Sequence, residues 1–564
     1  MQNMRLFLFM ALSFVTLLLW DAWQKDYAPK TPAPTSDATA IPNAQDIPPT
    51  AVNTTELPVG TVASPAGALP PTDGAPKIAA VEPVRSGQRI RVATDVLTLE
   101  IDTIGGDVRE VTLPRYLDKT GSTEKPFILL SDKQTPYFVA QTGLLSAQGA
   151  PDHHATFTAA QTNFSLEAGA DILRVPLTWT DANGITVTKT FVLRRGDYTI
   201  EVEQKVDNGS AAEWRARQYR QLQRSSHTAS SESALIVTYT GGVIYSPEKK
   251  YEKIKFDTMK SSDLTRTVVG GWTAMIQHYF VGAWIPEQDE TNTFYTKVPA
   301  EDRYVIGMVS PDKVVAAGQS AVFSTRLYMG PKAQQVMEKL APGLELTVDY
   351  GWLTVIAKPI FWLMRSIHDV VQNWGWSIIL LTLLIKLAFY KLSEASYRSM
   401  AHMRRVQPKM AALKERYGDD RQRMSQAMME LYRKEKINPL GGCLPIVVQI
   451  PVFIALYWVL LESVELRQAP FMAWITDLST RDPFYVLPLL MGITMFIQQK
   501  LNPPPPDPVQ AKVMMALPFV FTLFFAFFPA GLVLYWVANN TLSIAQQYVI
   551  TRRIEKLHAA PAKS

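Results

Sequence analysis

Five apolar segments in the last third of the chain constrain its fold more than any other feature. They cover residues 374–392, 444–461, 483–498, 513–528 and 531–550. A helix needs about 20 apolar residues to cross the hydrocarbon core of a bilayer. Only 19% of the residues are charged, against about 25% in an average soluble domain. The sequence therefore predicts a polytopic α-helical membrane bundle with a five-span core.

A sixth apolar run, residues 6–20, lies near the N-terminus behind Arg5. Trp20 and Trp23 occupy the positions where a signal peptidase would need small residues. We expect residues 1–27 to be an uncleaved signal anchor, which brings the spans to six, and a cleaved signal peptide is the alternative. Residues 28–85 are rich in proline and alanine, a composition that predicts a disordered tether.

Residues 86–340 follow a period of two instead of a helical period. Leu97, Leu99 and Ile101 alternate with polar residues, and turn signals such as Asn183-Gly184 separate similar runs. This pattern predicts one large β-sandwich. Residues 341–373 return to helical spacing, and we expect an amphipathic helix that lies on the membrane surface.

The charges of the connecting segments predict how the spans are oriented. Residues 391–437 carry twelve Lys or Arg against six Asp or Glu, whereas residues 462–482 carry two against four. Basic loops remain in the cytoplasm. Both termini, including the basic tail 551–564, are then cytoplasmic, and residues from about 21 to 373 are periplasmic.

Residues 393–437 of that basic segment are predicted to form a cytoplasmic hairpin of two helices. Methionines recur along it at helical spacing, namely Met400, Met403, Met410, Met424 and Met428. Such a stripe usually forms the hairpin's own core. The alternative is an adaptable surface that captures apolar segments of other chains. The basic faces would meet RNA, anionic lipid or only solvent.

Motifs for hydrolysis or nucleotide-driven transport are missing from the sequence. It contains no His-Glu-x-x-His, Walker loop or Gly-x-Ser-x-Gly. Cys443 is the single cysteine, which excludes a disulfide framework and a cysteine-based zinc site. We interpret His153 and His154 as loop residues rather than metal ligands. The sequence therefore predicts a protein that is not an enzyme and has no cofactor and no metal.

Lys386 is the one charge well inside an apolar segment. A cation at the bilayer centre costs about 2.5–3.5 kcal/mol on insertion scales. Its ammonium either snorkels to the interface near Lys391 or serves a wet, positively charged cavity. Thr382, one turn earlier, Gln449 and Asn540 are the polar candidates to line that cavity, although amides in spans also bond helix to helix.

Three motifs resemble those of the YidC family of membrane protein insertases of Gram-negative bacteria. They are residues 438–445 (NPLGGCLP), 463–471 (SVELRQAPF) and 531–536 (GLVLYW), and the resemblance extends over the whole chain. It implies a hydrophilic groove in the five-span core, with its essential cation at Lys386. Thr382 matches a groove residue, and Trp536, beside Tyr535, matches an aromatic that contacts substrate. The sandwich resembles a sugar-mutarotase supersandwich.

The resemblance also implies a function. The chain would insert, fold and help assemble proteins of the bacterial inner membrane, alone or with the Sec translocon, without nucleotide hydrolysis. Implied partners are nascent membrane proteins, SecYEG, SecDF, the ribosome with the signal-recognition pathway, and lipid, but no DNA. The alternatives are a small-molecule transporter, which would show an inverted repeat, and an anchored periplasmic carbohydrate-binding module, which would need only one span.

Overall fold

The computed structural model describes residues 86–118, 125–226, 238–417, 420–435, 444–502 and 508–559. The expected signal anchor, the tether, most of the motif at 438–445 and residues 560–564 of the tail lie outside these ranges. The described chain falls into two units, of which one comprises residues 405–437 and the other the remaining described residues.

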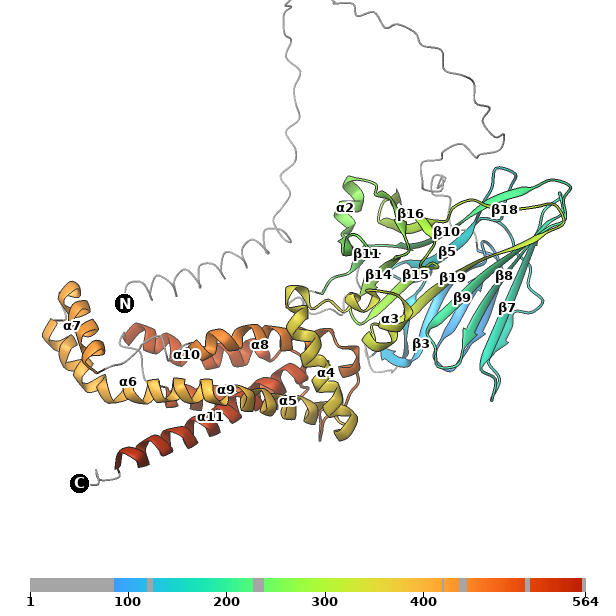
Figure 1. Cartoon of the computed structure of the whole chain (residues 1–564). Helices are drawn as coiled ribbons and strands as arrows, with labels where there is room; N and C mark the ends of the chain where they lie inside the picture. The colour runs from blue at the N-terminus through green and yellow to red at the C-terminus, as the bar shows by residue number, and fades with distance from the viewer. Residues whose placement is uncertain are drawn as a thin grey trace, which may run out of the picture. The chain divides into compact units, whose positions relative to one another are not determined.

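The predicted β-sandwich is confirmed, with two sheets of eleven and eight strands (Figure 1). The larger sheet contains, in spatial order, β13 (Thr265–Val269), β16 (Thr291–Ala300), β17 (Arg303–Val309), β10 (Trp214–Arg224), β5 (Phe138–Leu145), β3 (Asp107–Asp118), β2 (Thr98–Asp102), β1 (Arg89–Ala93) and β6 (Asn163–Ser165), with β18 (Lys313–Val315) on β10 and β4 (Lys125–Leu130) on β3. The smaller sheet contains β12 (Lys250–Ile254), β11 (Gly241–Ser246), β14 (Trp272–Gln277), β15 (Phe280–Ile285), β19 (Ser320–Pro331), β9 (Thr199–Asn208), β8 (Ile185–Arg194) and β7 (Ile172–Thr180).

The strands alternate apolar and polar residues, and their apolar side chains fill the space between the two sheets. Leu99 and Ile101 of β2 are fully buried there. On β8 and β9, Phe191 stands opposite Val202 in an antiparallel register, and both belong to the same core. This is the one-sided burial that a period of two predicts.

Strands β14 and β15 depart from alternation because both of their faces are buried. Trp284 faces the core between the sheets, whereas Val281, Ala283 and Ile285 belong to a second core that continues into the helices. Trp272 Nε1 also donates to the carbonyl oxygen of Pro342, at 3.0 Å. The outer face of these two strands is therefore covered by the segment that leads out of the sandwich.

The helices follow the sandwich in the chain, except for α2 (Phe256–Ser261). They are α3 (Gln334–Leu340), the short 3₁₀ turns η1 (Leu344–Thr347) and η2 (Gly351–Leu353), α4 (Thr354–Val371), α5 (Trp374–Ala388), α6 (Tyr390–Tyr417), α7 (Arg421–Lys434), α8 (Leu444–Glu462), the turn η3 (Val464–Leu466), α9 (Val486–Leu501), α10 (Pro508–Phe525) and α11 (Ala530–Ala559). Helix α11 packs on α5 and α9, while α10 packs on α9.

The helix bounds differ from the expected spans at several places. Helix α5 ends at Ala388, four residues before the predicted boundary, and the chain bends by 68° into α6. Helix α11 continues past residue 550 to Ala559. Among the described residues no single helix is both long and apolar enough to cross a membrane, and the bent pair α5 and α6 passes that test of length and composition.

Helix α4 has two faces of opposite character. Ala357, Ile360, Phe361 and Met364 are buried, and the helix packs on α5 and α8. The other face exposes apolar side chains, beginning with Trp352 in η2, which is 82% exposed. The predicted amphipathic pattern is thus present, with an apolar face that the described residues leave uncovered.

A buried ion pair joins the sandwich to the helical region. Lys332 Nζ, just after β19, lies 2.7 Å from a carboxylate oxygen of Glu462, the last residue of α8, and both side chains are at most 4% exposed. Nearby, Arg467 and Gln468 each donate to the carbonyl oxygen of Leu117, both at 2.7 Å. His278 Nε2 lies 3.1 Å from the carbonyl oxygen of Leu461.

We predict that Lys332→Met destabilises the protein by about 3–5 kcal/mol, because it leaves the buried Glu462 carboxylate without its partner. The double variant Lys332→Met/Glu462→Leu should recover most of that loss, since it removes both charges. Lys297→Met, which breaks an exposed pair with Asp263, should cost at most about 1 kcal/mol. Thermal unfolding of the purified full chain measures all three. A double variant as unstable as the single one would contradict this account of the joint.

Candidate functional site

Lys386 lies near the C-terminal end of α5, and its half-buried ammonium reaches across to α11. Nζ donates to Ser543 Oγ at 2.8 Å, and that hydroxyl donates to the carbonyl oxygen of Asn539 at 2.7 Å. Within the described part of the chain, no ion pair with a carboxylate within 4.0 Å is formed by Lys386. The ammonium is therefore held by a neutral hydroxyl and has no carboxylate partner among the described residues.

The sequence prediction missed Ser543. It is buried and stands three residues after Asn540 and four before Gln547, which places all three on one stripe of α11. That spacing was the available signal. A lone serine in a helix is easily passed over, because its hydroxyl usually bonds to the preceding turn, as this one does.

Two of the predicted polar residues enter the neighbourhood of Lys386. Gln449 Nε2 lies 3.5 Å from Asn539 Oδ1 and so links α8 to α11. Thr382 is buried one turn before Lys386, and its hydroxyl donates to the carbonyl oxygen of Ile378 in its own helix, at 2.6 Å. Lys386 and Gln449 thus converge on α11 from two different helices.

Asn540 lies on the same stripe of α11 as Ser543 but bonds to a different helix. Its Nδ2 donates to Thr494 Oγ1 of α9 at 3.3 Å. Gln547 also bonds to α9, two turns on, where its Nε2 donates to the carbonyl oxygen of Leu501 at 3.1 Å. These two amides make the interhelical hydrogen bonds that were the alternative interpretation for them.

The predicted aromatic pair lies at the other end of α11. Tyr535 is buried and stacks on Phe453 of α8, with ring centroids 5.9 Å apart. The Trp536 ring lies 4.8 Å from Phe453 and 5.5 Å from Phe525 of α10. Trp536 Nε1 is buried without a hydrogen-bond partner among the described residues. An indole N–H in this state is an available donor, because burial without a bond is unfavourable.

Apolar side chains cover the outer faces of α9 and α10. Leu489 and Ile493 are 58% and 47% exposed, and Phe519 and Leu523 are both 68% exposed. Exposed apolar surface of this extent on adjacent helices marks an interaction with a membrane or with another protein.

The hairpin methionines are only partly used as a core. Within residues 405–437, Met428 is buried, and Tyr432 Oη lies 3.9 Å from Met410 Sδ. Lys409 and Glu435 form an ion pair of 2.6 Å between α6 and α7. Met424 is half-buried, as are Met400 and Met403 in the part of α6 that precedes this unit. The hairpin core therefore accounts for Met410 and Met428.

The loop after α8 buries a carboxyl group that is not neutralised by an ion pair. Glu465 of η3 has a buried Oε1 without a hydrogen-bond partner, and burial raises the pKa of this side chain to about 7, although Arg365 on α4 acts in the opposite direction. Burial likewise lowers the pKa of His278, beside the same joint, to about 4. Near neutral pH the His278 ring is therefore neutral, whereas the Glu465 carboxyl group is about half protonated.

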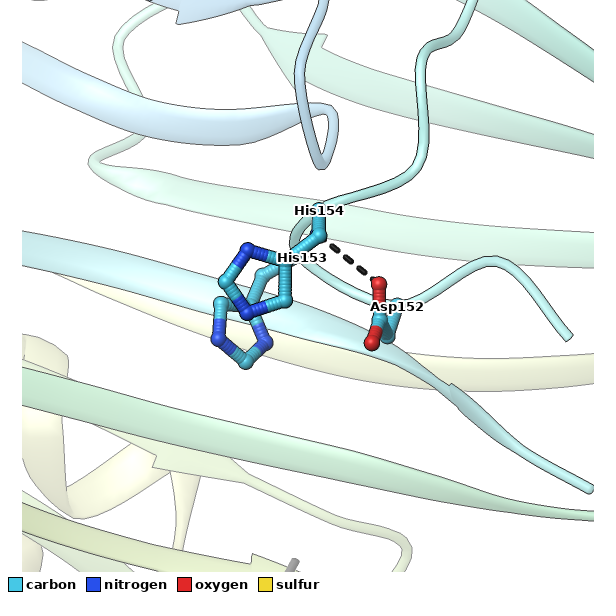
Figure 2. Close-up of side chains that lie close together, drawn as sticks. All are labelled: Asp152, His153 and His154. Carbon is cyan, nitrogen blue, oxygen red and sulfur yellow. Dashed lines mark hydrogen bonds between the residues drawn. The ribbon is translucent and has the colours of Figure 1, made fainter. Parts of the chain in front are cut away.

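One histidine cluster lies away from the helices. Figure 2 shows Asp152, His153 and His154, whose ligand-type atoms lie within 4.8 Å of one another. The Tyr219 hydroxyl accepts from the backbone N–H of His153 at 2.7 Å and lies 2.7 Å from His153 Nδ1. We assign the Tyr219 hydroxyl as the donor of this bond and His153 Nδ1 as the acceptor. The ring proton of His153 then lies on Nε2, so neither of its ring nitrogens has a free lone pair for a metal. The cluster fits a loop anchor better than a metal site.

These features define a class, namely a membrane-type helical bundle, in which Lys386 has no carboxylate partner among the described residues, joined to a large β-sandwich. The family model described as the YidC periplasmic domain matches residues 89–363, and the model described as 60Kd inner membrane protein matches residues 366–557. The curated protein "Membrane protein insertase YidC" of Methylococcus capsulatus is 55% identical over 99% of both chains. Its counterpart of Thioalkalivibrio sulfidiphilus is 53% identical over 99% of both.

The chain belongs to the YidC family of membrane protein insertases. These relatives are named as insertases and not as enzymes. A solved structure, "Active YidC insertase crystal structure with the first transmembrane domain resolved", is 18% identical, covers 82% of this chain and 93% of its own, and has a TM-score of 0.39.

We predict that Glu465→Gln stabilises the protein at pH 8 but not at pH 5. The folded pKa of Glu465 is raised, so the wild type loses stability as the pH rises from about 4.5 through 7, by on the order of 3 kcal/mol. Glutamine removes this loss. The lowered pKa of His278 acts in the opposite direction between pH 6.5 and 4, but it is common to both proteins and cancels in their difference.

Unfolding midpoints of the two full-length proteins from pH 5 to pH 8 provide the test. Glu301→Gln, at an exposed position, is the matched control and should follow the wild type throughout. Parallel curves for the wild type and Glu465→Gln would contradict the burial of a charged carboxylate at this loop.

Proposed function

We propose that the chain inserts and folds inner-membrane proteins through a hydrophilic groove around Lys386, without nucleotide hydrolysis. The exported tail of a client enters from the cytoplasmic side and lowers its desolvation cost beside the Lys386 cation. The apolar segment of the client then moves along the helices into lipid, and its hydrophobic burial drives the step.

The observation that carries this proposal is the state of Lys386. Its ammonium is half-buried among apolar helices and donates to the neutral hydroxyl of Ser543 at 2.8 Å. A cation without a counter-ion in such a place is unfavourable and is usually functional. A client carboxylate would supply the missing charge. Gln449 and Asn539 extend the polar surface toward α8.

The exposed apolar faces support a membrane location for the helical region. Leucine, isoleucine and phenylalanine side chains cover the outside of α9 and α10, which is the surface that lipid would contact. We further propose six spans with both termini in the cytoplasm, the sandwich in the periplasm and α4 in the outer interface. The excess of Lys and Arg in residues 391–437 supports this orientation, because basic loops remain in the cytoplasm.

The partners follow from this arrangement. Nascent membrane proteins are the clients, the ribosome with the signal-recognition pathway delivers them, and SecYEG with SecDF shares some of them. Each partner meets a different part of the chain, with delivery at the basic hairpin and release along α8 and α10.

We predict that Lys386→Ala slows the insertion of single-span clients with acidic exported tails about tenfold, the effect of losing one interaction of about 1.4 kcal/mol. Lys386→Arg should retain activity because it retains the charge. Ser543→Ala should also retain most of it, because the hydroxyl only positions the ammonium. Lys391→Ala, at an exposed lysine five residues on, is the control for general loss of charge.

Protease protection in proteoliposomes without nucleotide measures these rates. A normal rate for Lys386→Ala with acidic clients would refute the role of the cation. Uptake of a small solute without client insertion would favour the transporter instead.

A second prediction concerns the hairpin. Photocrosslinkers at Met403 and Met424, which the hairpin core leaves half-exposed, should capture client chains stalled during synthesis. A crosslinker at Gln426, on the exposed polar face of α7, is the control and should capture far less. Equal capture at all three positions, or normal growth when a short Gly/Ser linker replaces residues 393–437, would contradict client capture by the methionines.

A further inference from the structure

A hollow of about 380 Å³ lies where the edge of the smaller sheet meets the start of α4. Tyr251 and Lys253 of the edge strand β12 line one side, and Asp349 and Thr354 line the other. At about 30 Å³ per water this space would hold roughly a dozen waters. It is large enough for a small polar group that carries two charges.

The hollow contains opposite charges and a spare hydroxyl. Lys253 and Asp349 form an ion pair with side chains 35% and 23% exposed. The Tyr251 phenol oxygen is buried without a hydrogen-bond partner among the described residues. A ligand that carries both a phosphate and an ammonium would replace the one ion pair by two, and it would give the phenol a partner.

The surroundings of the hollow favour a lipid as the source of such a ligand. Lys249, Lys250 and Lys255 are exposed beside Lys253, while Glu252 is paired with Arg266 at 2.7 Å. This basic edge suits a phosphate-covered surface. On the other side of the hollow, Trp352 and Val355 are 82% and 83% exposed. Exposed tryptophan next to lysine is typical of the boundary between lipid headgroups and acyl chains.

We propose that this hollow is a binding site for the headgroup of an aminophospholipid of the outer leaflet. The phosphate lies on Lys253, the ammonium lies on Asp349, and the acyl chains follow the exposed face of α4 from Trp352 onward. The site anchors the edge of the sandwich to the bilayer surface. This inference rests on the proposed seating of α4 in the membrane interface, so the test examines that seating separately.

Native mass spectrometry of the purified full chain, titrated with phosphatidylethanolamine, measures the binding. Lys253→Ala should weaken binding about tenfold, the effect of losing one charge-assisted hydrogen bond. Lys253→Arg should bind like the wild type, and Tyr251→Phe should weaken binding by a smaller factor. Lys297→Ala breaks the ion pair with Asp263 away from the hollow and should leave binding unchanged. Equal affinity of Lys253→Ala, Lys297→Ala and the wild type would overturn the proposal.

Two further measurements identify the cause of a failure. Soluble phosphorylethanolamine at the same concentration should not displace the lipid, and displacement would mean that a free phosphate compound is the ligand. Lipids with brominated acyl chains in nanodiscs should quench the tryptophan fluorescence of Trp352. The contribution of Trp352 is the difference in fluorescence between the wild type and Trp352→Phe. Absence of quenching would refute the membrane seating of α4, whereas quenching together with equal lipid binding by all variants would refute only the headgroup site.

Discussion

Burial of strands β14 and β15 of the smaller sheet on both of their faces is the constraint on which the rest of the structure depends. All six residues of β15 are buried, with Trp284 toward the core between the sheets and Val281 toward the helices. Each large apolar side chain that is fully buried contributes about 1.5–3 kcal/mol. The outer face therefore requires a cover, and the segment from α3 to α4 supplies it. The exit of the chain from the sandwich is fixed by this contact.

The same cover sets the position of the helical region. Helix α4 presents Ile360 and Phe361 to a core shared with α5, α8 and α11. Polar contacts complete the junction between the sandwich and the helices, above all the buried ion pair of Lys332 and Glu462. Either charged group would be costly to bury without its partner. The shared apolar core holds the sandwich and the helices together, and the ion pair fixes how they are aligned with each other. This arrangement allows the sandwich to act as a fixed support for the loop that follows α8.

At Lys386, by contrast, a charged side chain is half-buried without a charged partner among the described residues. Its neighbours Leu383, Leu384 and Leu387 are exposed apolar residues of α5, and its own ammonium turns inward to Ser543. A protein that needed only a stable helix would have an apolar residue here. The proposed function gives a reason for retaining a charge, because a client tail would then find a favourable place beside Lys386 before its apolar segment reaches lipid.

The sequence by itself determined the classes of structure and the isolated charge. Period-two alternation predicted the sandwich, long apolar runs predicted the helices, and Lys386 stood out because a single charge in an apolar run is visible without any contact. These signals are local, since they depend on residues within one or two turns of each other. The bounds of α5 and α11 were less exact, because helix ends depend on packing as well as on hydropathy.

Only the tertiary structure decided which distant residues meet. Lys332 and Glu462 are 130 residues apart, Lys386 and Ser543 are 157 apart, and Arg467 and Leu117 are 350 apart. No period in the sequence relates such positions, because their contact depends on the register of whole sheets and helices against each other. The same holds for Asn540, which sequence reasoning placed in one polar group with Lys386, and for Gln547 on the same stripe of α11. The rotation of α11 turns them toward α9, where amides find partners and avoid lipid.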